Sequence, residues 1–227
     1  MLLLAVDTSG KNGSLALANV HDHEFDVLEL VPLAGRMYSA QIIPELQNAL
    51  TRQSLKKTDI DAYAVASGPG SFTGLRVGLS TVKALSEVLH KPIAAVSVLE
   101  AAARISRQSG RVIVALDAGR KQVFVGEYQF DREFNVVSAE ESLVTLESFL
   151  SPTSARRIAF SPDQSVRDAA ATHGVIIREI PGPQADMFAR IGYGKIVRGE
   201  TTAAEVLEAN YIRASDAELF SLPKLTS

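Results

Sequence analysis

Two aspartates occupy similar positions in the two halves of this 227-residue chain. Asp7 and Asp117 each follow an apolar segment, residues 2–6 and 113–116, and each begins a short polar turn. An aspartate in such a turn can hold a magnesium ion through water, and nearby N–H groups and hydroxyls can hold phosphate oxygens. An aspartate can equally stabilise its own tight turn. The pair is therefore compatible with a phosphate site or with two self-capped turns.

A glycine-rich loop is the second candidate for chemistry. Residues 67–74 read Ser-Gly-Pro-Gly-Ser-Phe-Thr-Gly and precede a helical pattern over residues 75–89. The N-terminus of that helix carries unpaired N–H groups and suits an anion, whereas Ser71 or Thr73 would cap the helix with a hydroxyl. The spacing matches neither a Walker loop nor the dinucleotide fingerprint. The loop predicts an anion site or a tight structural turn.

Together, these segments predict a nucleotide site. ATP or ADP with magnesium would bind there or at a junction with a partner chain, and we expect the chain itself to require no cofactor. The candidate residues are Asp7, Thr8, Ser9, Gly68, Gly70, Ser71 and Asp117.

The elements that position these residues repeat along the chain. Periodicity predicts strands at 2–6, 14–19, 25–31, 62–66 and 93–96, and helices at 39–53, 75–89 and 98–106. This βββαβαβα order restarts half-way along the chain, where Asp117 takes the place of Asp7 and strands are expected at 113–116, 122–130 and 136–144. An internal duplication of this kind predicts two α/β lobes, residues 1–107 and 108–227, that meet at a cleft.

The composition narrows the functional classes. The chain has no cysteine, which excludes disulfides, thiolate metal sites and thiol nucleophiles. Its net charge is −3, and its short basic clusters (Lys56-Lys57, Arg104/Arg107/Arg111 and Arg156-Arg157) are typical of solvated faces. If RNA is involved, we expect a partner to make most of the contacts. The first residues resemble neither a signal peptide nor a spanning helix, so we expect a cytoplasmic protein without membrane association.

The glycine loop also carries a family resemblance. Residues 68–78, Gly-Pro-Gly-Ser-Phe-Thr-Gly-Leu-Arg-Val-Gly, closely resemble the signature of the bacterial TsaB (YeaZ) family. The opening strand, Ile43-Pro44-Glu45-Leu46, the Ala-Leu-Asp-Ala at 115–118 and the tail Tyr211-Ile212-Arg213 are similar to further segments of that family, in the same order. The resemblance covers nearly the whole chain.

The resemblance implies the duplicated two-lobe fold of actin, sugar kinases and Hsp70 ATPase domains, which is ribonuclease H-like. It also implies a role beside TsaD and the ATPase TsaE, which together transfer a threonylcarbamoyl group to N6 of adenosine 37 in tRNAs that read codons starting with A. Members of the family are needed for this reaction but are not held to carry its chemistry. On this basis we expect tRNA to be contacted through the complex.

The histidines are consistent with a partner that does no catalysis. The catalytic relative holds a metal with a His-x-x-x-His pair, and none of His21, His23, His90 and His173 lies at that spacing. We therefore predict no metal site and no catalytic residue, with His21 and His23 in an exposed turn. Many relatives carry a histidine just before the first helix, where this chain has Tyr38, so a polar role at that position is not carried over.

The helices at 39–53 and 75–89 are apolar over more than one face, which predicts either core packing or a partner interface. The resemblance implies an interface with TsaD, and the same surface would serve a homodimer because the two proteins share a fold. The expected interface residues are Tyr38, Ile42, Ile43, Leu46, Leu79, Val82, Lys83 and Ser86.

Three other functions compete with this one. A stand-alone nucleotide-binding protein or ATPase of the same fold would need an adenosine pocket, and no clear Gly-Gly motif for one is present. A metalloprotease would need the metal ligands that the chain lacks. A self-associating regulatory protein without a role in tRNA modification would use the same apolar helices.

Overall fold

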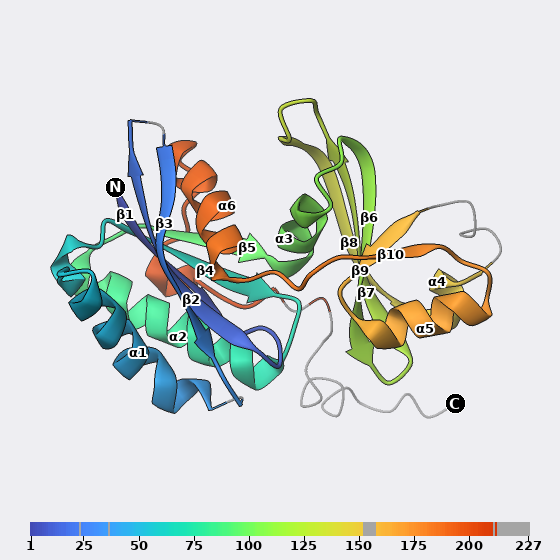
Figure 1. Cartoon of the computed structure of the whole chain (residues 1–227), viewed down its shortest axis with the longest axis horizontal. Coiled ribbons are helices and arrows are strands. Elements are labelled where there is room, and N and C mark those ends of the chain that lie inside the picture. Colours follow the sequence, from blue (N-terminus) through green and yellow to red (C-terminus); the bar gives the residue numbers. More distant parts are fainter. Residues whose placement is uncertain (23, 36, 152–157, 211, 213–227) are drawn as a thin grey trace, which may run out of the picture.

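The computed structural model describes residues 1–22, 24–35, 37–151, 158–210 and 212. Two five-stranded sheets, each with helices on its faces, form two lobes (Figure 1). The first sheet contains β1 (Leu2–Asp7), β2 (Gly13–His21), β3 (Glu24–Leu33), β4 (Ala62–Gly68) and β5 (Ile93–Ser97). The second contains β6 (Gly110–Gly119), β7 (Gln122–Phe130), β8 (Val136–Thr145), β9 (Ala159–Ser161) and β10 (Ile177–Glu179).

The helices complete the repeat. They are α1 (Tyr38–Arg52), α2 (Phe72–Leu89), α3 (Val98–Ile105), α4 (Leu146–Phe149), α5 (Gln164–Thr172) and α6 (Ala185–Val197), with short 3₁₀ turns η1 (Lys57–Asp59) and η2 (Ala204–Val206). Each half therefore follows the predicted βββαβαβα order. The sheet orders, β3-β2-β1-β4-β5 and β8-β7-β6-β9-β10, correspond strand for strand. The predicted duplication is confirmed.

The central strands owe their position to their sequence. β1 pairs antiparallel with β2 and parallel with β4, and all six of its residues are buried. A strand covered on both faces needs a continuous apolar run rather than an alternating one, and Leu-Leu-Leu-Ala-Val provides it. In the second sheet β6 has the same pairing, antiparallel with β7 and parallel with β9.

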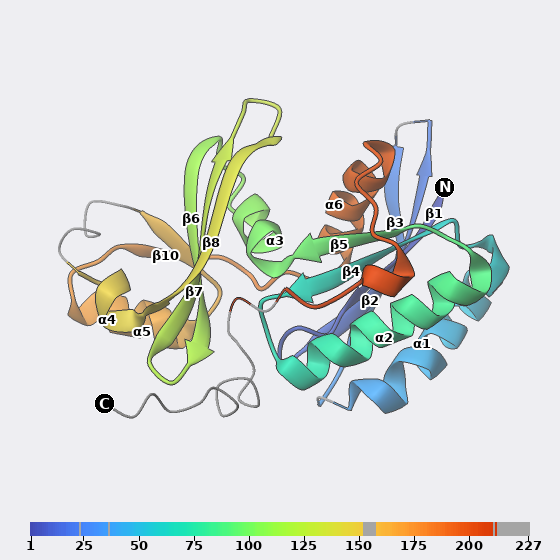
Figure 2. The ribbon, with the colours of Figure 1, turned by 180° about the vertical axis from the view of Figure 1, so that it is seen from behind.

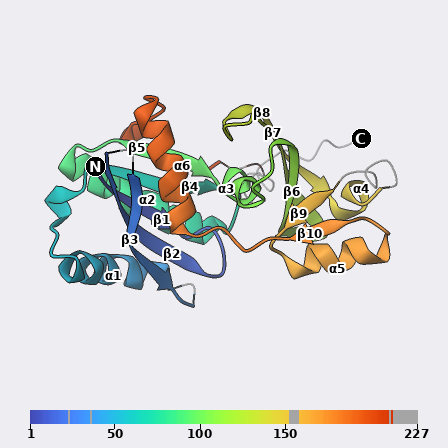
Figure 3. The same ribbon diagram turned by 45° about the horizontal axis from the view of Figure 1, so that its top comes forward.

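The last helix of each half covers the sheet of the other half. Figure 3 shows α6 lying across the first sheet, where it contacts β1, β2, β4 and β5. Helix α3 packs on β6 and β7 of the second sheet, and one apolar core runs from the first sheet through α3 into the second. The predicted boundary between residues 107 and 108 lies after the last strand of the first sheet and before the first strand of the second. The packed first lobe nevertheless includes α6, which comes from the second half of the chain.

The first lobe also holds the segment after α6. We call residues 202–210 the C-terminal strap. It begins with Thr202, whose N–H donates to the Ile93 carbonyl at 2.8 Å, and its turn η2 packs against α2 (Figure 2). Within the described part of the chain, no helix combines the length and the apolar character needed to span a membrane.

Candidate functional site

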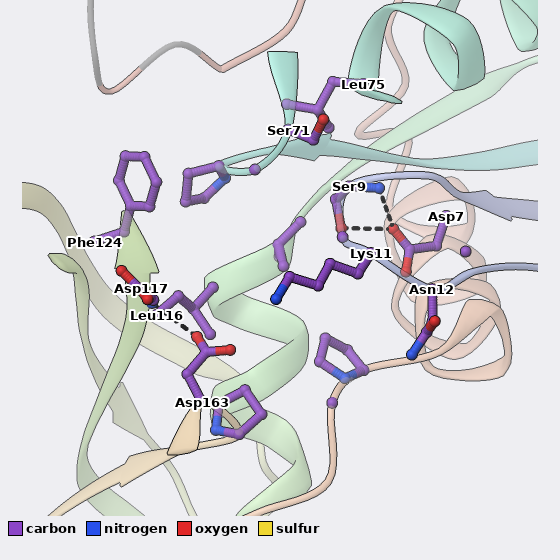
Figure 4. A pocket seen from close by; sticks show the side chains of 18 of the residues that line it. Asp7, Ser9, Lys11, Asn12, Ser71, Leu75, Leu116, Asp117, Phe124 and Asp163 are labelled. Carbon is purple, nitrogen blue, oxygen red and sulfur yellow. Dashed lines mark hydrogen bonds between the residues drawn. The ribbon is translucent and has the colours of Figure 1, made fainter. Parts of the chain in front are cut away.

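A cavity of about 1650 Å³ opens between the two lobes. Its walls come from the turn after β1, the loop before α2, the turn after β6 and the segments that lead into α5 and α6 (Figure 4). The first three of these segments are those that the sequence singles out. They lie together because neighbouring strands deliver the loops at their carboxyl ends to one edge of a sheet.

Asp7 lies at the first-lobe side of this cavity. Its side chain is only 3% exposed, and its Oδ1 accepts hydrogen bonds from the Ser9 N–H at 2.9 Å and the Ser9 hydroxyl at 2.6 Å. Burial raises the pKa of Asp7 to about 6, and the two bonds from Ser9 limit the rise. Asp7 therefore caps its own turn, as the simpler of the two interpretations predicts.

The glycine loop packs directly on that turn. The Ser71 N–H donates to the Ser9 carbonyl at 2.7 Å, and a Cβ added at Gly70 would lie 2.5 Å from the same oxygen. A Cβ at Gly74 would overlap the Thr8 carbonyl oxygen, while the Thr8 hydroxyl donates to the Gly74 carbonyl at 2.7 Å. Glycine is needed at these positions because the backbone of the turn lies where a side chain would be.

Ser71 also caps helix α2. Its hydroxyl accepts from the Gly74 N–H at 3.3 Å, and the helix begins at Phe72, three residues before the predicted start at residue 75. The capping alternative is thus confirmed for Ser71, whereas Thr73 lies inside the helix.

The second-lobe side of the cavity is more open. Asp117 is exposed, and its carboxylate accepts from the Gly119 N–H at 2.7 Å and the Ser165 hydroxyl at 2.8 Å. The Asp117 N–H donates to the carboxylate of Asp163 at 2.7 Å. Burial raises the pKa of Asp163, and the nearby Asp117 charge adds to the rise.

Lys11 reaches between the two sides. Figure 4 shows its side chain extending from the turn after β1 into the cavity toward Asp163. Its positive charge opposes the rise in the pKa of Asp163. The cavity therefore holds carboxylates from both lobes and a lysine ammonium between them.

The cavity collects most of the predicted nucleotide residues. Asp7, Ser9, Gly70, Ser71 and Asp117 line it, while Thr8 and Gly68 do not. Sequence reasoning missed Lys11, Asp163 and Ser165. A signal for Asp163 was present, because it follows a short strand, β9, much as Asp7 ends β1 and Asp117 lies near the end of β6.

The first-lobe turns offer a phosphate few unused donors. The Ser9 N–H and hydroxyl bind Asp7, the Thr8 hydroxyl binds Gly74, and the Ser71 N–H binds Ser9. The residues fit a nucleotide only in part, although the first lobe presents two cationic side chains, Lys11 and Arg76, to the cavity. Nucleotide binding stays a prediction.

The predicted interface residues differ in their exposure. Ile43 is 54% exposed, and Lys83 is half-buried with its Nζ donating to the Glu205 carbonyl at 3.2 Å. The others are buried within the first lobe because one side of each helix faces the sheet and η2 covers part of α2. These buried residues are Tyr38, Ile42, Leu46, Leu79, Val82 and Ser86. An interface on α1 and α2 would have to use their exposed neighbours.

Tyr38, at the position where the family resemblance predicts a histidine, has a structural contact. It is 2% exposed, and its hydroxyl donates to the Gly10 carbonyl at 2.9 Å. A Cβ added at Gly13 would collide with its ring. Tyr38 therefore holds the start of α1 against the turn that carries Asp7.

Among the described residues, no group of three or more His, Asp and Glu side chains is placed to hold a metal ion. His21 is the exposed last residue of β2, and its ring contacts Asp22 of the following turn at 3.0 Å. His23, Arg156, Arg157, Tyr211 and Arg213 lie outside the described residues.

Comparison with known proteins places the chain in a family. A model of the family described as "TsaD: tRNA N6-adenosine threonylcarbamoyltransferase" matches residues 31–215. The tRNA threonylcarbamoyladenosine biosynthesis protein TsaB of Escherichia coli (strain K12) is 31% identical over an alignment of 227 positions, which covers 94% of this chain and 95% of that protein. The tRNA N6-adenosine threonylcarbamoyltransferase of Anaeromyxobacter sp. (strain Fw109-5) is 35% identical over 113 residues, 44% of this chain and 34% of that protein.

A solved structure agrees with these sequence matches. YeaZ from Pseudomonas aeruginosa is 25% identical and superposes with a TM-score of 0.74 over 92% of this chain and 100% of that one. The predicted two-lobe fold of the actin and Hsp70 type is confirmed. Since the likeness to TsaB extends over almost the whole of both sequences and to the three-dimensional structure, this chain belongs to the TsaB (YeaZ) family.

Proposed function

We propose that this chain is a non-catalytic subunit of the machinery that forms N6-threonylcarbamoyladenosine at position 37 of tRNAs that read codons starting with A. It would bind and activate a TsaD-type transferase and act with TsaE. The observation that carries the proposal is the 31% identity to a TsaB protein along nearly all of both chains. The match to the transferase family over residues 31–215 supports a shared fold between the two partners.

The proposed contact surface is the outer side of α1 and α2. Ile43 on α1 and Val88 on α2 are 54% and 72% exposed, and Ser80 and Ala84, which precede Val88 on α2 at four-residue intervals, are exposed and small. Small and apolar side chains let two helix pairs approach closely. A transferase of the same fold would present a similar helix pair, and a second copy of this chain could take its place in a homodimer.

The contribution to catalysis would be positional. A partner that holds the transferase in one arrangement removes conformational freedom before the reaction, and pre-organisation can lower a barrier by several kcal/mol without adding a reacting group. The acidic net charge of −3 favours an arrangement in which the partner makes most of the RNA contacts.

Reconstitution tests this function. Purified transferase, TsaE, the adenylate-forming enzyme, ATP, threonine, bicarbonate and unmodified tRNA are combined with and without this chain, and modified adenosine is measured by mass spectrometry. We expect product only when the chain is present and none from the chain alone. Equal product without the chain would contradict the proposal, as would product from the chain without the transferase.

A second candidate function is nucleotide binding in the cleft, with or without ATP hydrolysis. The cavity of about 1650 Å³ and its carboxylates favour it. Titration calorimetry with ADP, with magnesium and with EDTA, would test it for the chain alone and for the complex. A binding isotherm lost in Asp117→Ala supports the candidate, and the absence of heat in both samples removes it.

A further inference from the structure

One carboxylate outside the cavity joins three separate elements. Glu141 on β8 is half-buried and accepts hydrogen bonds from the Tyr128 hydroxyl, the Ser97 hydroxyl and the side-chain amide of Asn210. The Asn210 bond is 3.1 Å long. Tyr128 belongs to the same sheet as Glu141, whereas the other two donors come from the first lobe.

Each first-lobe donor is itself fixed. Ser97 ends β5 and caps α3, because its hydroxyl oxygen accepts from the Leu99 N–H at 3.1 Å and the Glu100 N–H at 3.3 Å. Asn210 ends the C-terminal strap, and its N–H donates to the Ser67 carbonyl at 2.7 Å, next to the glycine loop. Charged acceptors make the stronger hydrogen bonds, so one carboxylate can connect these ends effectively.

The C-terminal strap is otherwise a first-lobe element. Ala204 and Leu207 are buried in the core beneath α2, and Lys83 of α2 donates to the strap carbonyl of Glu205. Asn210 is the strap residue that bonds Glu141 of the second lobe, and it also lines the cavity. Any change in the angle between the lobes would therefore act on the bond between Glu141 and Asn210.

We propose that Glu141 is an interlobe latch, which sets the width of the cleft by holding the second sheet to the start of α3 and to the end of the C-terminal strap. Helix α3 is the pivot, since it packs so closely on the second sheet that a Cβ added at Gly126 would lie 3.1 Å from the Leu99 side chain. With the latch bonded, Asn210 at the end of the strap lines the cavity. With the latch broken, the lobes rotate about α3 and the strap end is released.

The inference concerns this chain alone and does not depend on the proposed function. Because the chain has no cysteine, Asn48→Cys on α1 and Ala171→Cys on α5 introduce the two labelling sites for a fluorescence energy-transfer pair that spans the lobes. Both positions are exposed. The latch is broken by Glu141→Ala, and Glu140→Ala is the matched control, because Glu140 is the exposed neighbour on the same strand.

We expect Glu141→Ala to broaden the energy-transfer distribution and to speed hydrogen exchange at the Asn210 amide about tenfold or more, with the amides of β1 unchanged. Glu141→Gln should restore much of the wild-type behaviour, since its amide oxygen can accept from Tyr128 and Ser97, and Asn210 can turn its own amide to accept. Asn210→Ala, at an exposed position, removes only the hydrogen bond between Asn210 and Glu141. If Glu141→Ala does not fold, the same two measurements on Asn210→Ala test the proposal. Distributions and exchange that match those of Glu140→Ala would overturn the proposal, and so would an equal acceleration of every amide, which indicates general destabilisation.

Discussion

The turns that follow β1 and β6 have the same place in the two lobes but different surroundings. Asp7 is buried, and its turn packs against the glycine loop. The contact is so close that a side chain at Gly70 or Gly74 would overlap the backbone of the turn. Asp117 is exposed, and its carboxylate accepts a hydrogen bond from the Ser165 hydroxyl at the start of α5. The same secondary structure thus supports a packed joint in one lobe and an accessible polar surface in the other.

This difference shows which part of the cleft is structural. On the first-lobe side, Asp7, Thr8, Ser9 and Ser71 are hydrogen-bonded within the two packed turns, and a change there should act on folding. On the second-lobe side, the same kind of change should act weakly on folding and leave the surface open to a ligand. Single substitutions at matched positions in the two turns test this difference.

The largest effect is expected at the glycine loop. Gly74→Ala would place a methyl group against the Thr8 carbonyl oxygen, which is backbone and cannot move aside without shifting β1. We expect a loss of at least ~3 kcal/mol in the free energy of unfolding, measured by urea denaturation. Gly182→Ala, where an added Cβ meets no atom within 4 Å, is the control and should change stability by less than about 0.5 kcal/mol. Equal stability of the two variants would contradict the packed joint.

The next effect is on pH dependence. Burial raises the pKa of Asp7 from 3.8 to about 6, so the folded state holds this proton more tightly than the unfolded chain. Stability from this group is fully present below pH 4 and is lost as the pH rises to about 6, by ~3 kcal/mol for about two pKa units. Asp7→Asn removes the titration and should flatten the curve of unfolding free energy between pH 4 and 7. Asp168→Asn, exposed on α5, is the control. A wild-type slope retained in Asp7→Asn would show that Asp7 is not the buried acid.

A smaller difference in stability is expected between substitutions of two serines that each donate a hydrogen bond to an aspartate. Ser9 donates to Asp7 in a buried site, and Ser165 donates to Asp117 in an exposed one. Ser9→Ala should cost about 1–2 kcal/mol, because the buried carboxylate loses a donor that water cannot easily replace. Ser165→Ala should cost less than ~0.5 kcal/mol. Thermal or urea unfolding of both variants measures the contrast, which disappears if the two losses are equal.

Much of the fold was predictable, because it follows from patterns of residue type within short segments of the sequence. The apolar run at β1, the duplicated element order and the glycines of residues 68–74 led to two lobes and a shared cleft. Which residues of α1 and α2 stay exposed could not be predicted for a physical reason: a helix that is apolar on more than one face can pack against a partner or against its own chain. Here η2 lies far along the sequence and covers part of α2.

Long-range polar contacts were also beyond the sequence. The bond between Glu141 and Asn210 joins residues that have no pattern in common, and the exchange of α3 and α6 between the lobes depends on the packing of whole sheets. Lys11 lay in a turn already singled out, but its direction into the cavity follows from the three-dimensional arrangement of the turn.

The most direct test of the proposed role is the affinity of this chain for the purified transferase, measured by titration calorimetry. Ile43→Asp places a charge on the exposed side of α1, and Ile176→Asp is the matched control, because Ile176 is 62% exposed on the second lobe. We predict saturable binding that Ile43→Asp weakens at least about tenfold and Ile176→Asp leaves unchanged. No binding by the wild-type chain would contradict the partner-subunit account, and equal binding by both variants would show that the partner does not bind at α1 and α2.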